Sequence, residues 1–539
     1  SLMPVCLPAV HRSPWFLHLS MAIRSAASGL VLVAAGLPLA VTSTPLQAQD
    51  YYADVRPILV ENCVGCHSED GIAWSMEDPE EAYRRRARIA RAVTRRIMPP
   101  WLAEPGHQAY VGDLSLDDAS VRVLERWAEA GYPRGTPRPD PTPRARHAAD
   151  GGAGGAAAHA RFVPDLSLDV LPAAGYLPDQ DASDDYRCFL VEWEEAGSTF
   201  VTGFRADPGN RNVAHHVVVY AVEPAMAARF RELEAEEEGD GYQCFGGALP
   251  DRLGQPEVRT AYEARYPDGI RELALGNFWL AHWAPGMDGH VFPAGTGIRV
   301  GPGSLLVVQM HYYSSNAPGE RDRDTRVDFM TAEAVERPAF HLAQTRNDWL
   351  AAARNGTMVI PAGERRTFEV RDNLGGLLGY FARLTGVERE RIRGLEIHSA
   401  NLHMHSFGHS GRVTLRHDTG RMETLLSVPR WDLAWQRDFT FTEPKVFPAE
   451  ALERVLLGVE CTFENPTDEP VYGGYGSLEE MCFNFSYIAV VEGEPPAKAG
   501  SGAGFSSGAG PGSGTGPGAG AGPGPGPRPV GNTSPDLRR

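Results

Sequence analysis

The sequence predicts a multidomain protein in which an α-helical domain is followed by two antiparallel β-sandwich domains of jelly-roll-like character. Three observations lead to this fold class. The chain has 539 residues, enough for roughly three or four domains of ordinary size. Residues 49–135 show helical patterns around 51–61, 78–97 and 115–130. From about 161 to 494, short β-forming runs such as HVVVYAV and CFNFSYIAVV alternate with Gly, Pro, Asn and Asp, which is typical of antiparallel sandwiches.

The composition excludes some classes of protein. Hydrophobic residues make up 42% of the chain and charged residues 22%, as in ordinary globular proteins. These proportions argue against a mostly disordered chain and against a protein with many membrane spans. Lys and Arg number 51 against 69 Asp and Glu, which gives a formal net charge of −18. Because nucleic acids are polyanions, we expect no nucleic-acid partner.

The N-terminal segment predicts export. Arg24 precedes a short apolar run at 27–42, and Ala48 ends the segment before the first polar stretch. This is the layout of a secretory signal peptide, which we assign to residues 1–48. A retained membrane anchor is the alternative, but the run is shorter than the ~20 residues of a spanning helix, and Pro38 interrupts it. We therefore expect a periplasmic or extracellular protein with no membrane span after cleavage.

Shifts in composition give the domain boundaries. The helical domain takes residues 49–135, and a Pro-rich, then Gly/Ala-rich linker follows at 136–160. The two β-sandwich domains are expected at 161–340 and 341–494. Residues 495–539 are almost entirely Gly, Pro, Ala and Ser and predict a disordered tail, because they cannot bury enough apolar surface to offset chain entropy.

The run CVGCH at 63–67 is the attachment signature of a c-type haem. Cys63 and Cys66 would form thioethers with the porphyrin, and the adjacent His67 would be the proximal iron ligand. A redox-active cysteine pair would prefer a βαβ context, which the pattern lacks. Half of a zinc site would need further Cys or His nearby. We therefore expect one covalently bound haem c.

The sixth iron ligand should follow later in the helical domain. We assign it to Met98, whose proline neighbours would hold the backbone extended, with Met76 and His107 as weaker competitors. Ligation by His and Met raises the reduction potential and suits electron transfer. On these motifs the small domain resembles a class I cytochrome c, so the expected fold is an α-helical cytochrome c domain followed by the two sandwiches.

Five histidines and one methionine stand out in the β-rich part. His403 and His405 have i,i+2 spacing, which places both imidazoles on one face of a strand. The adjacent pair His215-His216 could serve one metal only if the backbone were irregular there, because neighbours on a strand point to opposite faces. His311 in a β-forming run and Met481 in the run EMC would, taken alone, be structural.

In this order, the HH pair, the strand histidine, the H-x-H and the EMC resemble the copper type II, ascorbate-dependent monooxygenases, which include peptidylglycine alpha-hydroxylating and dopamine beta-monooxygenase. The resemblance covers residues 161–494. It implies two copper ions, held by two ligand sets. The electron-transfer copper would be held by His215, His216 and His311. The catalytic, dioxygen-binding copper would be held by His403, His405 and Met481.

Of the seven cysteines, Cys6 leaves with the signal peptide and two bind the haem, so four remain, which allow three disulfide pairings. The simplest choice, which agrees with the resemblance, pairs Cys188 with Cys244 and Cys461 with Cys482. Period-2 geometry places Cys482 on the opposite face from Met481.

Together these motifs predict an enzyme that hydroxylates a C–H bond of a small organic substrate with O2. In the related enzymes ascorbate supplies the electrons; here a haem reduced by an upstream donor would replace or assist it. The expected path runs from the haem to the first copper and then to the second. The alternatives are an electron-transfer or copper-binding protein without hydroxylation, and an enzyme that reduces O2 or a nitrogen oxide. Asn401-Leu402 stand where the peptide-hydroxylating enzyme carries a carboxylate-binding Arg, so the resemblance implies no peptidylglycine substrate.

Overall fold

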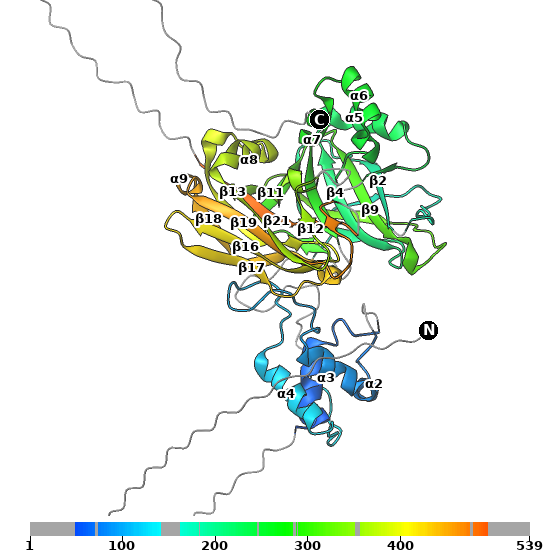
Figure 1. The fold of residues 1–539 in the computed structure, drawn as a ribbon, viewed down its shortest axis with the longest axis vertical. Helices are drawn as coiled ribbons and strands as arrows, with labels where there is room; N and C mark the ends of the chain where they lie inside the picture. Colours follow the sequence, from blue (N-terminus) through cyan, green and yellow to red (C-terminus); the bar gives the residue numbers. More distant parts are fainter. Residues whose placement is uncertain are drawn as a thin grey trace, which may run out of the picture.

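The computed structural model describes residues 49–69, 74–141, 162–182, 184–244, 247–283, 287, 289–350, 356–474 and 478–493 (Figure 1). The predicted signal peptide, most of the linker and the Gly/Pro-rich tail lie outside the described residues. None of the helices in the described ranges combines the length and the apolar character that a membrane crossing requires.

A five-stranded antiparallel sheet forms one layer of the N-terminal β region, in the order β5-β2-β9-β4-β6. Its strands are β5 (Tyr242–Gln243), β2 (Asp184–Glu192), β9 (Leu305–Tyr313), β4 (Ala214–Val222) and β6 (Asn277–Trp283). The central strand β9 is buried at every position but the last, because both of its faces are covered. Leu306 and Val308 face the sandwich core, whereas Leu305 and Val307 pack under α5 (Pro224–Ala235) and α7 (Gly269–Leu275).

A ten-stranded sheet runs through both halves of the β-rich part, in the order β1-β10-β3-β8-β11-β21-β14-β18. Along this path lie β1 (Leu166–Asp169), β10 (Arg326–Ala332), β3 (Thr199–Asp207), β8 (Thr296–Val300), β11 (Arg337–Gln344), β21 (Phe483–Glu492), β14 (Ile392–Ala400) and β18 (Phe439–Pro448). Two short strands join its side, namely β7 (His290–Val291) on β3 and β15 (Leu402–His403) on β21. The pairing of β8 with β11 is parallel.

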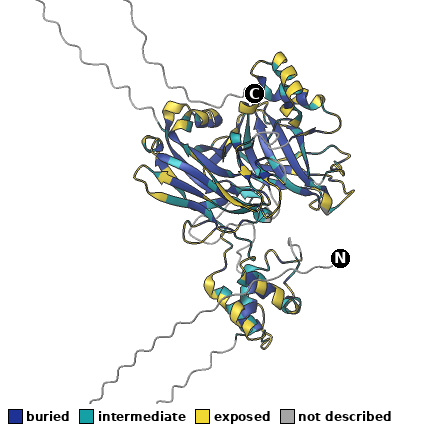
Figure 2. Cartoon of the chain, viewed as in Figure 1, coloured by how far each residue is buried: buried dark blue, intermediate teal, exposed yellow. Residues whose placement is uncertain are grey.

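The C-terminal half adds a four-stranded antiparallel sheet in the order β13-β19-β16-β17. It consists of β13 (Arg365–Asn373), β19 (Val455–Glu464), β16 (Gly408–His417) and β17 (Met422–Val428), and β12 (Val359–Ile360) pairs with β20 (Val471–Tyr472) nearby. Val413 and Val459 from this sheet share one apolar core with Leu395 and Ile488 of the ten-stranded sheet. The strands are therefore mainly buried, and exposed residues gather on helices and loops (Figure 2).

The remaining helices are short. They are η1 (Tyr51–Val55), α1 (Arg56–Asn62), α2 (Pro79–Arg84), α3 (Arg86–Thr94), α4 (Asp118–Glu129), α6 (Pro256–Arg265), α8 (Leu378–Thr385), α9 (Ala449–Leu452) and several 3-10 turns, among them η8 (Leu433–Trp435). The helices before residue 135 gather around Trp127 and Tyr51, two fully buried aromatic residues whose rings stack 5.8 Å apart.

The predicted fold class is wrong in two respects. First, the molecule is mostly β-sheet, and the described residues 49–141 form no α-helical cytochrome c domain. Helices α1 to α4 have only 7, 6, 9 and 12 residues, η1 adds 5, and the rest of the described part of this region is turns and extended chain. The periodicity located individual helices, but it carries no information on whether they assemble into one particular domain.

Second, the β-rich part is not two separate antiparallel sandwiches. The five-stranded and four-stranded sheets each cover part of the same ten-stranded sheet, and this shared sheet contains a parallel pair. The link between the halves is the antiparallel pairing of β11 with β21, which runs from Ala339↔Ala489 to Gln344↔Asn484. Alternating patterns predict strands and their faces, but not which strand edges pair across a long separation.

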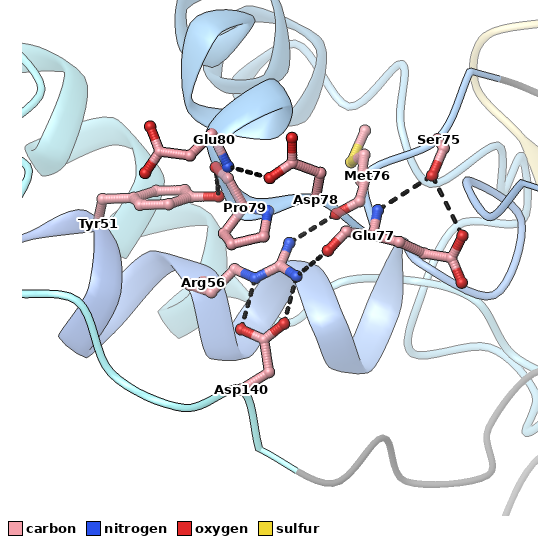
Figure 3. A network of polar contacts seen from close by, with 9 residues as sticks. All are labelled: Tyr51, Arg56, Ser75, Met76, Glu77, Asp78, Pro79, Glu80 and Asp140. Carbon is pink, nitrogen blue, oxygen red and sulfur yellow. Dashed lines mark hydrogen bonds and ion pairs between the residues drawn. The ribbon is translucent and has the colours of Figure 1, made fainter.

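A buried arginine ties three segments of the helical region together (Figure 3). The Arg56 guanidinium, 2% exposed, donates to the carbonyl oxygens of Met76 and Glu77 at 2.6 and 2.7 Å, and forms a bidentate pair with Asp140. Because its charge is both paired and hydrogen-bonded, burial of this guanidinium is tolerated. The network joins α1 to the segment before α2 and to the start of the predicted linker.

Residues 101–113 form a strap that packs on the C-terminal half. Backbone hydrogen bonds join Val111 to Thr440 and Glu104 to Ser427, both at 2.8 Å. The hydroxyl of Tyr110, 6% exposed, donates to the carbonyl oxygen of Leu425 at 2.7 Å. The strap thus attaches the helical region to β17 and β18.

Candidate functional site: two histidine groups in one cavity

His215, His216 and His311 come together on the outer face of the five-stranded sheet. Their ligand atoms lie within 4.8 Å of one another. The Nδ1 atom of His311 lies 3.4 Å from Nδ1 of His215 and 3.5 Å from Nδ1 of His216. Two adjacent histidines can do this because the pairing of β4 with β9 shifts between Ala214 and His216, a bulge that redirects one side chain. The backbone irregularity that such a pair requires is therefore present.

Asp184 orients the first histidine group. Its Oδ1 lies 2.9 Å from Nε2 of His311, so Nε2–H donates and the lone pair of this imidazole is on Nδ1, facing the other two rings. The Tyr186 ring stacks on His311 at 4.0 Å with an interplanar angle of 8°. Three ring nitrogens that face one another this closely favour a cation between them.

His403 and His405 form a second group, and Met481 borders the same cavity. His403 is at the end of β15, and the two imidazole centroids are 5.4 Å apart. Nδ1 of His403 donates to the side-chain oxygen of Gln436, and Nδ1 of His405 donates to the carbonyl oxygen of Glu479 at 2.9 Å. Both hydrogen bonds select the tautomer with its lone pair on Nε2.

Met481 is held by a buried turn just before β21. The Glu480 carboxylate, fully buried, accepts backbone hydrogen bonds from His405 at 2.9 Å and from Phe407 at 2.6 Å. Cys482 forms a disulfide with Cys461 on β19. The backbone on both sides of Met481 is therefore tied to the H-x-H segment and to the neighbouring sheet.

Both groups line the same cavity of about 710 Å³. All six predicted metal ligands border it, namely His215, His216, His311, His403, His405 and Met481. The tertiary fold brings the two groups to one cavity, because their residues come from segments that are far apart in the sequence.

Burial keeps these imidazoles neutral. It lowers the pKa of His215 to about 4 and that of His403 to about 3, and it lowers the pKa of His216 well below its ordinary value. Neighbouring imidazoles add to each shift. Because the rings carry no proton on the ligating nitrogen at neutral pH, protons compete little with a metal for these sites.

Three aromatic side chains beside the second group were not foreseen from the sequence. Phe483 and Phe485 stack at 5.4 Å with an interplanar angle of 8°, and Trp279 packs on Phe485 at 4.4 Å. The signal for two of them was present, because residues 481, 483 and 485 alternate and must share one strand face. No sequence signal marked Asp184 or Gln436, which reach the histidines only through the tertiary fold.

The CVGCH motif follows α1 as a tight turn. The amides of Cys66 and His67 donate to the carbonyl oxygen of Cys63 at 3.2 and 2.9 Å. The two cysteines, both among the described residues, form no disulfide with each other. Nδ1 of the buried His67 donates to the carbonyl oxygen of Trp74 at 2.8 Å, which fixes its tautomer.

The other candidate iron ligands lie in different settings. Met98, half-buried, follows α3, and Met76 is buried in the helical core. His107 is exposed on the strap and lies 3.3 Å from Glu104. The assignment of Met98 as the sixth ligand stays a prediction.

Both predicted disulfides are present. Cys188 of β2 bonds to Cys244 after β5, and Cys461 bonds to Cys482. Because disulfides persist in oxidising compartments, they are consistent with an exported protein.

Comparison with known proteins gives one relevant similarity. No family model matches the chain. Over 231 residues, 40% of its length, the chain is 25% identical to "MOXD1 homolog 1" of Drosophila melanogaster, and it spans 29% of that protein. This weak similarity, over less than half of this chain and less than a third of that protein, supports a distant relationship to the monooxygenases that the motifs resemble. It gives no support to a haem or to a cytochrome c fusion.

Similarity to solved structures carries no argument. The major capsid protein P2 from Bacteriophage PM2 aligns with 60% of this chain and 98% of its own, at 9% identity and a TM-score of 0.22. PNGF-II aligns with 61% of this chain and 65% of its own, at 8% identity and a TM-score of 0.24.

Proposed function

We propose that this protein is a copper-dependent monooxygenase that hydroxylates a C–H bond of a small organic substrate with O2. The observation that carries the proposal is the cavity in which two separate histidine groups, one with a thioether, face each other. Neutral, buried imidazoles suit both oxidation states of copper, and the soft sulfur of Met481 favours the reduced ion. The donor sets therefore fit two copper ions.

In this proposal His215, His216 and His311 hold the electron-transfer ion, and His403, His405 and Met481 hold the catalytic one. Bound at these sites, copper would supply one-electron transfer and the activation of O2. The protein contributes the geometry. Asp184 and Gln436 fix the ring orientations, and the Cys461–Cys482 disulfide with the Glu480 hydrogen bonds holds Met481 at the cavity wall.

We further infer that the CVGCH motif binds a covalent haem, which would relay electrons from an upstream donor with or instead of ascorbate. Two thiols outside any disulfide and a histidine held through Nδ1 fit such a group. The strap places Trp101 beneath the Arg437 guanidinium, 5.4 Å from the ring centroid, and Arg437 adjoins Gln436, which contacts His403.

Metal analysis and a product assay test the proposal. The purified chain should bind two copper ions, and O2 uptake should depend on an organic co-substrate and yield a hydroxylated product. Met481→Ala should abolish hydroxylation, leave copper at the three-histidine site and leave any haem spectrum intact. Met422→Ala, at a position 48% exposed on β17, is the matched control and should retain full activity.

Two results would refute the assignment. Hydroxylation that survives Met481→Ala would remove the catalytic site from this position. O2 consumption without any organic product would instead favour a protein that only reduces O2. For the haem, the intact mass of the purified chain should exceed that of the polypeptide by one haem, and the double variant Cys63→Ala, Cys66→Ala should lose this increment. A wild-type mass equal to that of the polypeptide alone would rule haem attachment out.

A further inference from the structure

We infer that the substrate is an uncharged, largely apolar molecule with an aromatic or similarly flat group, bound against Trp279, Phe483 and Phe485. This inference rests on the proposed function and concerns the substrate alone. It follows from the shape and chemistry of the cavity wall beside the second histidine group.

The aromatic wall adjoins that group directly. The centroids of Phe485 and Phe483 lie 6.2 and 6.4 Å from the His403 ring, and all three residues line the cavity. Phe483 and Phe485 are nearly parallel, and Trp279 closes the wall at an angle of 32° to Phe485. Stacked rings present a flat apolar surface, on which an aromatic ligand gains both buried area and ring contacts.

Within the described part of the chain, no basic side chain other than histidine lines this wall, and the buried side chain of Asp438 behind it is already bonded to the lining residues Asn401 and His282. Among the described lining residues, the ionisable side chains are histidines, tyrosines and Asp184. Asp184 is bonded to His311 of the other histidine group. Asn401, which lines the wall side, is neutral, and its amide donates to Asp438 at 2.9 Å. A substrate carboxylate would lose its hydration here without a cation to pair with, and a substrate ammonium would have to reach Asp438 past Asn401 and His282.

The rim of the cavity is also apolar. Leu478 and Tyr380 line it and are 79% and 39% exposed. Large exposed apolar side chains at the mouth of a cavity indicate the passage of apolar ligands. The volume of about 710 Å³ suits a small organic molecule.

Three probes of similar size test the inference on the full chain, both metal-free and copper-loaded. They are 2-phenylethanol, which is uncharged, 2-phenylethylammonium and 3-phenylpropanoate, and binding is measured by calorimetry. We expect 2-phenylethanol to bind roughly tenfold or more tightly than either charged probe. Equal or tighter binding of a charged probe, or no binding of any of the three, would overturn the inference.

Substitutions locate the binding surface. Phe485→Ala should weaken 2-phenylethanol binding roughly tenfold, and Phe485→Leu, which keeps the bulk, should weaken it less. Asn401→Arg should shift the preference towards 3-phenylpropanoate, whereas Met422→Ala should change nothing. Unchanged binding in Phe485→Ala would place the ligand elsewhere.

Copper binding, measured by electron paramagnetic resonance on the same preparations, separates the two proposals. Failure to bind copper at His403, His405 and Met481 would refute the proposed function. Normal copper binding together with a preference for charged probes would refute only the substrate inference.

Discussion

The side-chain oxygen of Gln436 accepts a hydrogen bond from Nδ1–H of His403, although the two residues lie on different segments of the chain. Gln436 follows the 3-10 turn η8, whereas His403 ends β15. This contact fixes the orientation and the tautomer of the His403 imidazole, so that the ring lone pair is on Nε2. A residue outside the H-x-H motif therefore controls whether the motif can bind a metal.

Replacing Gln436 should therefore weaken metal binding at the second group only. Gln436→Leu removes the acceptor, and we expect copper affinity at this group to fall about 10- to 100-fold, as for other partners of metal-bound histidines. Gln436→Glu, which keeps an acceptor oxygen, should restore most of the affinity. Competition with a copper chelator measures the effect, and the three-histidine group in the same sample serves as the internal control. Equal loss at both groups would mean that the variant had disturbed the whole fold.

The Cys461–Cys482 disulfide should stabilise both the fold and the position of Met481. The bond closes a loop of 21 residues. We expect the double variant Cys461→Ala, Cys482→Ala to lose about 3 kcal/mol of the free energy of unfolding, as loop closure of this length predicts. Guanidinium denaturation without reductant measures the loss, and wild type in reductant is the comparison. A change below about 1 kcal/mol would show that the Glu480 contacts alone hold this region.

Tyr110 should control the attachment of the strap. Its hydroxyl donates to the carbonyl oxygen of Leu425. Leu425 has no partner in the ladder of β16 and β17, because the register shifts there from Val413↔Leu426 to Thr414↔Thr424. Tyr110→Phe leaves this buried carbonyl without that donor and should cost about 1–2 kcal/mol. Hydrogen exchange should accelerate in residues 101–113 and around Leu425. Tyr380→Phe, at an exposed position, should leave exchange in the strap unchanged, and unaltered exchange in Tyr110→Phe would contradict the role.

His341 should make the fold sensitive to acid. Burial lowers its pKa to about 3, against an opposing effect of Asp438 and with further lowering by His282 and His290. The unfolded chain, with a histidine pKa of about 6.5, binds this proton first. The folded state therefore loses stability as the pH falls from about 6.5 towards 3, by up to about 1.4 kcal/mol for each pH unit.

His341→Gln should reduce this slope. Denaturation at pH 7, 6 and 5 measures the dependence, and the difference between wild type and variant isolates one group from the other buried histidines. Met422→Ala, at a position 48% exposed and without a titratable group, should keep the wild-type slope. Parallel curves for wild type and His341→Gln would show that His341 does not contribute.

The sequence could predict those metal-ligand candidates whose spacing along the chain already places them on one face of a strand. The i,i+2 spacing of His403 and His405 sets a shared face in any strand, and residue 481 continues into the alternation of 483 and 485. The pair His215-His216 needed a bulge, which pairing with a distant strand creates and local pattern does not reveal. Asp184 and Gln436 reach their histidines through tertiary packing alone, so no local signal could identify them.

The fold was less predictable than the ligands. Short alternating runs located most strands, and the helical patterns around 51–61, 78–97 and 115–130 correspond to helices. The shared ten-stranded sheet depends on the pairing of β11 with β21, strands separated by more than a hundred residues, and this choice is made by the whole core. The CVGCH motif specifies a chemical attachment and no fold, which is why the described residues 49–69 and 74–141 lack the cytochrome c domain inferred from it.

The unbroken ladder from β11 to β21 also limits how the molecule can move. Each half carries one histidine group, and a hinge between them would have to rupture six consecutive residue pairings of buried backbone. The pairing of β11 with β21 therefore resists any change in the distance between the two histidine groups. We expect ligands to enter the cavity through rotation of exposed lining side chains, chiefly those of Leu478 and Tyr380. Catalysis in this cavity would then require no domain closure over the substrate.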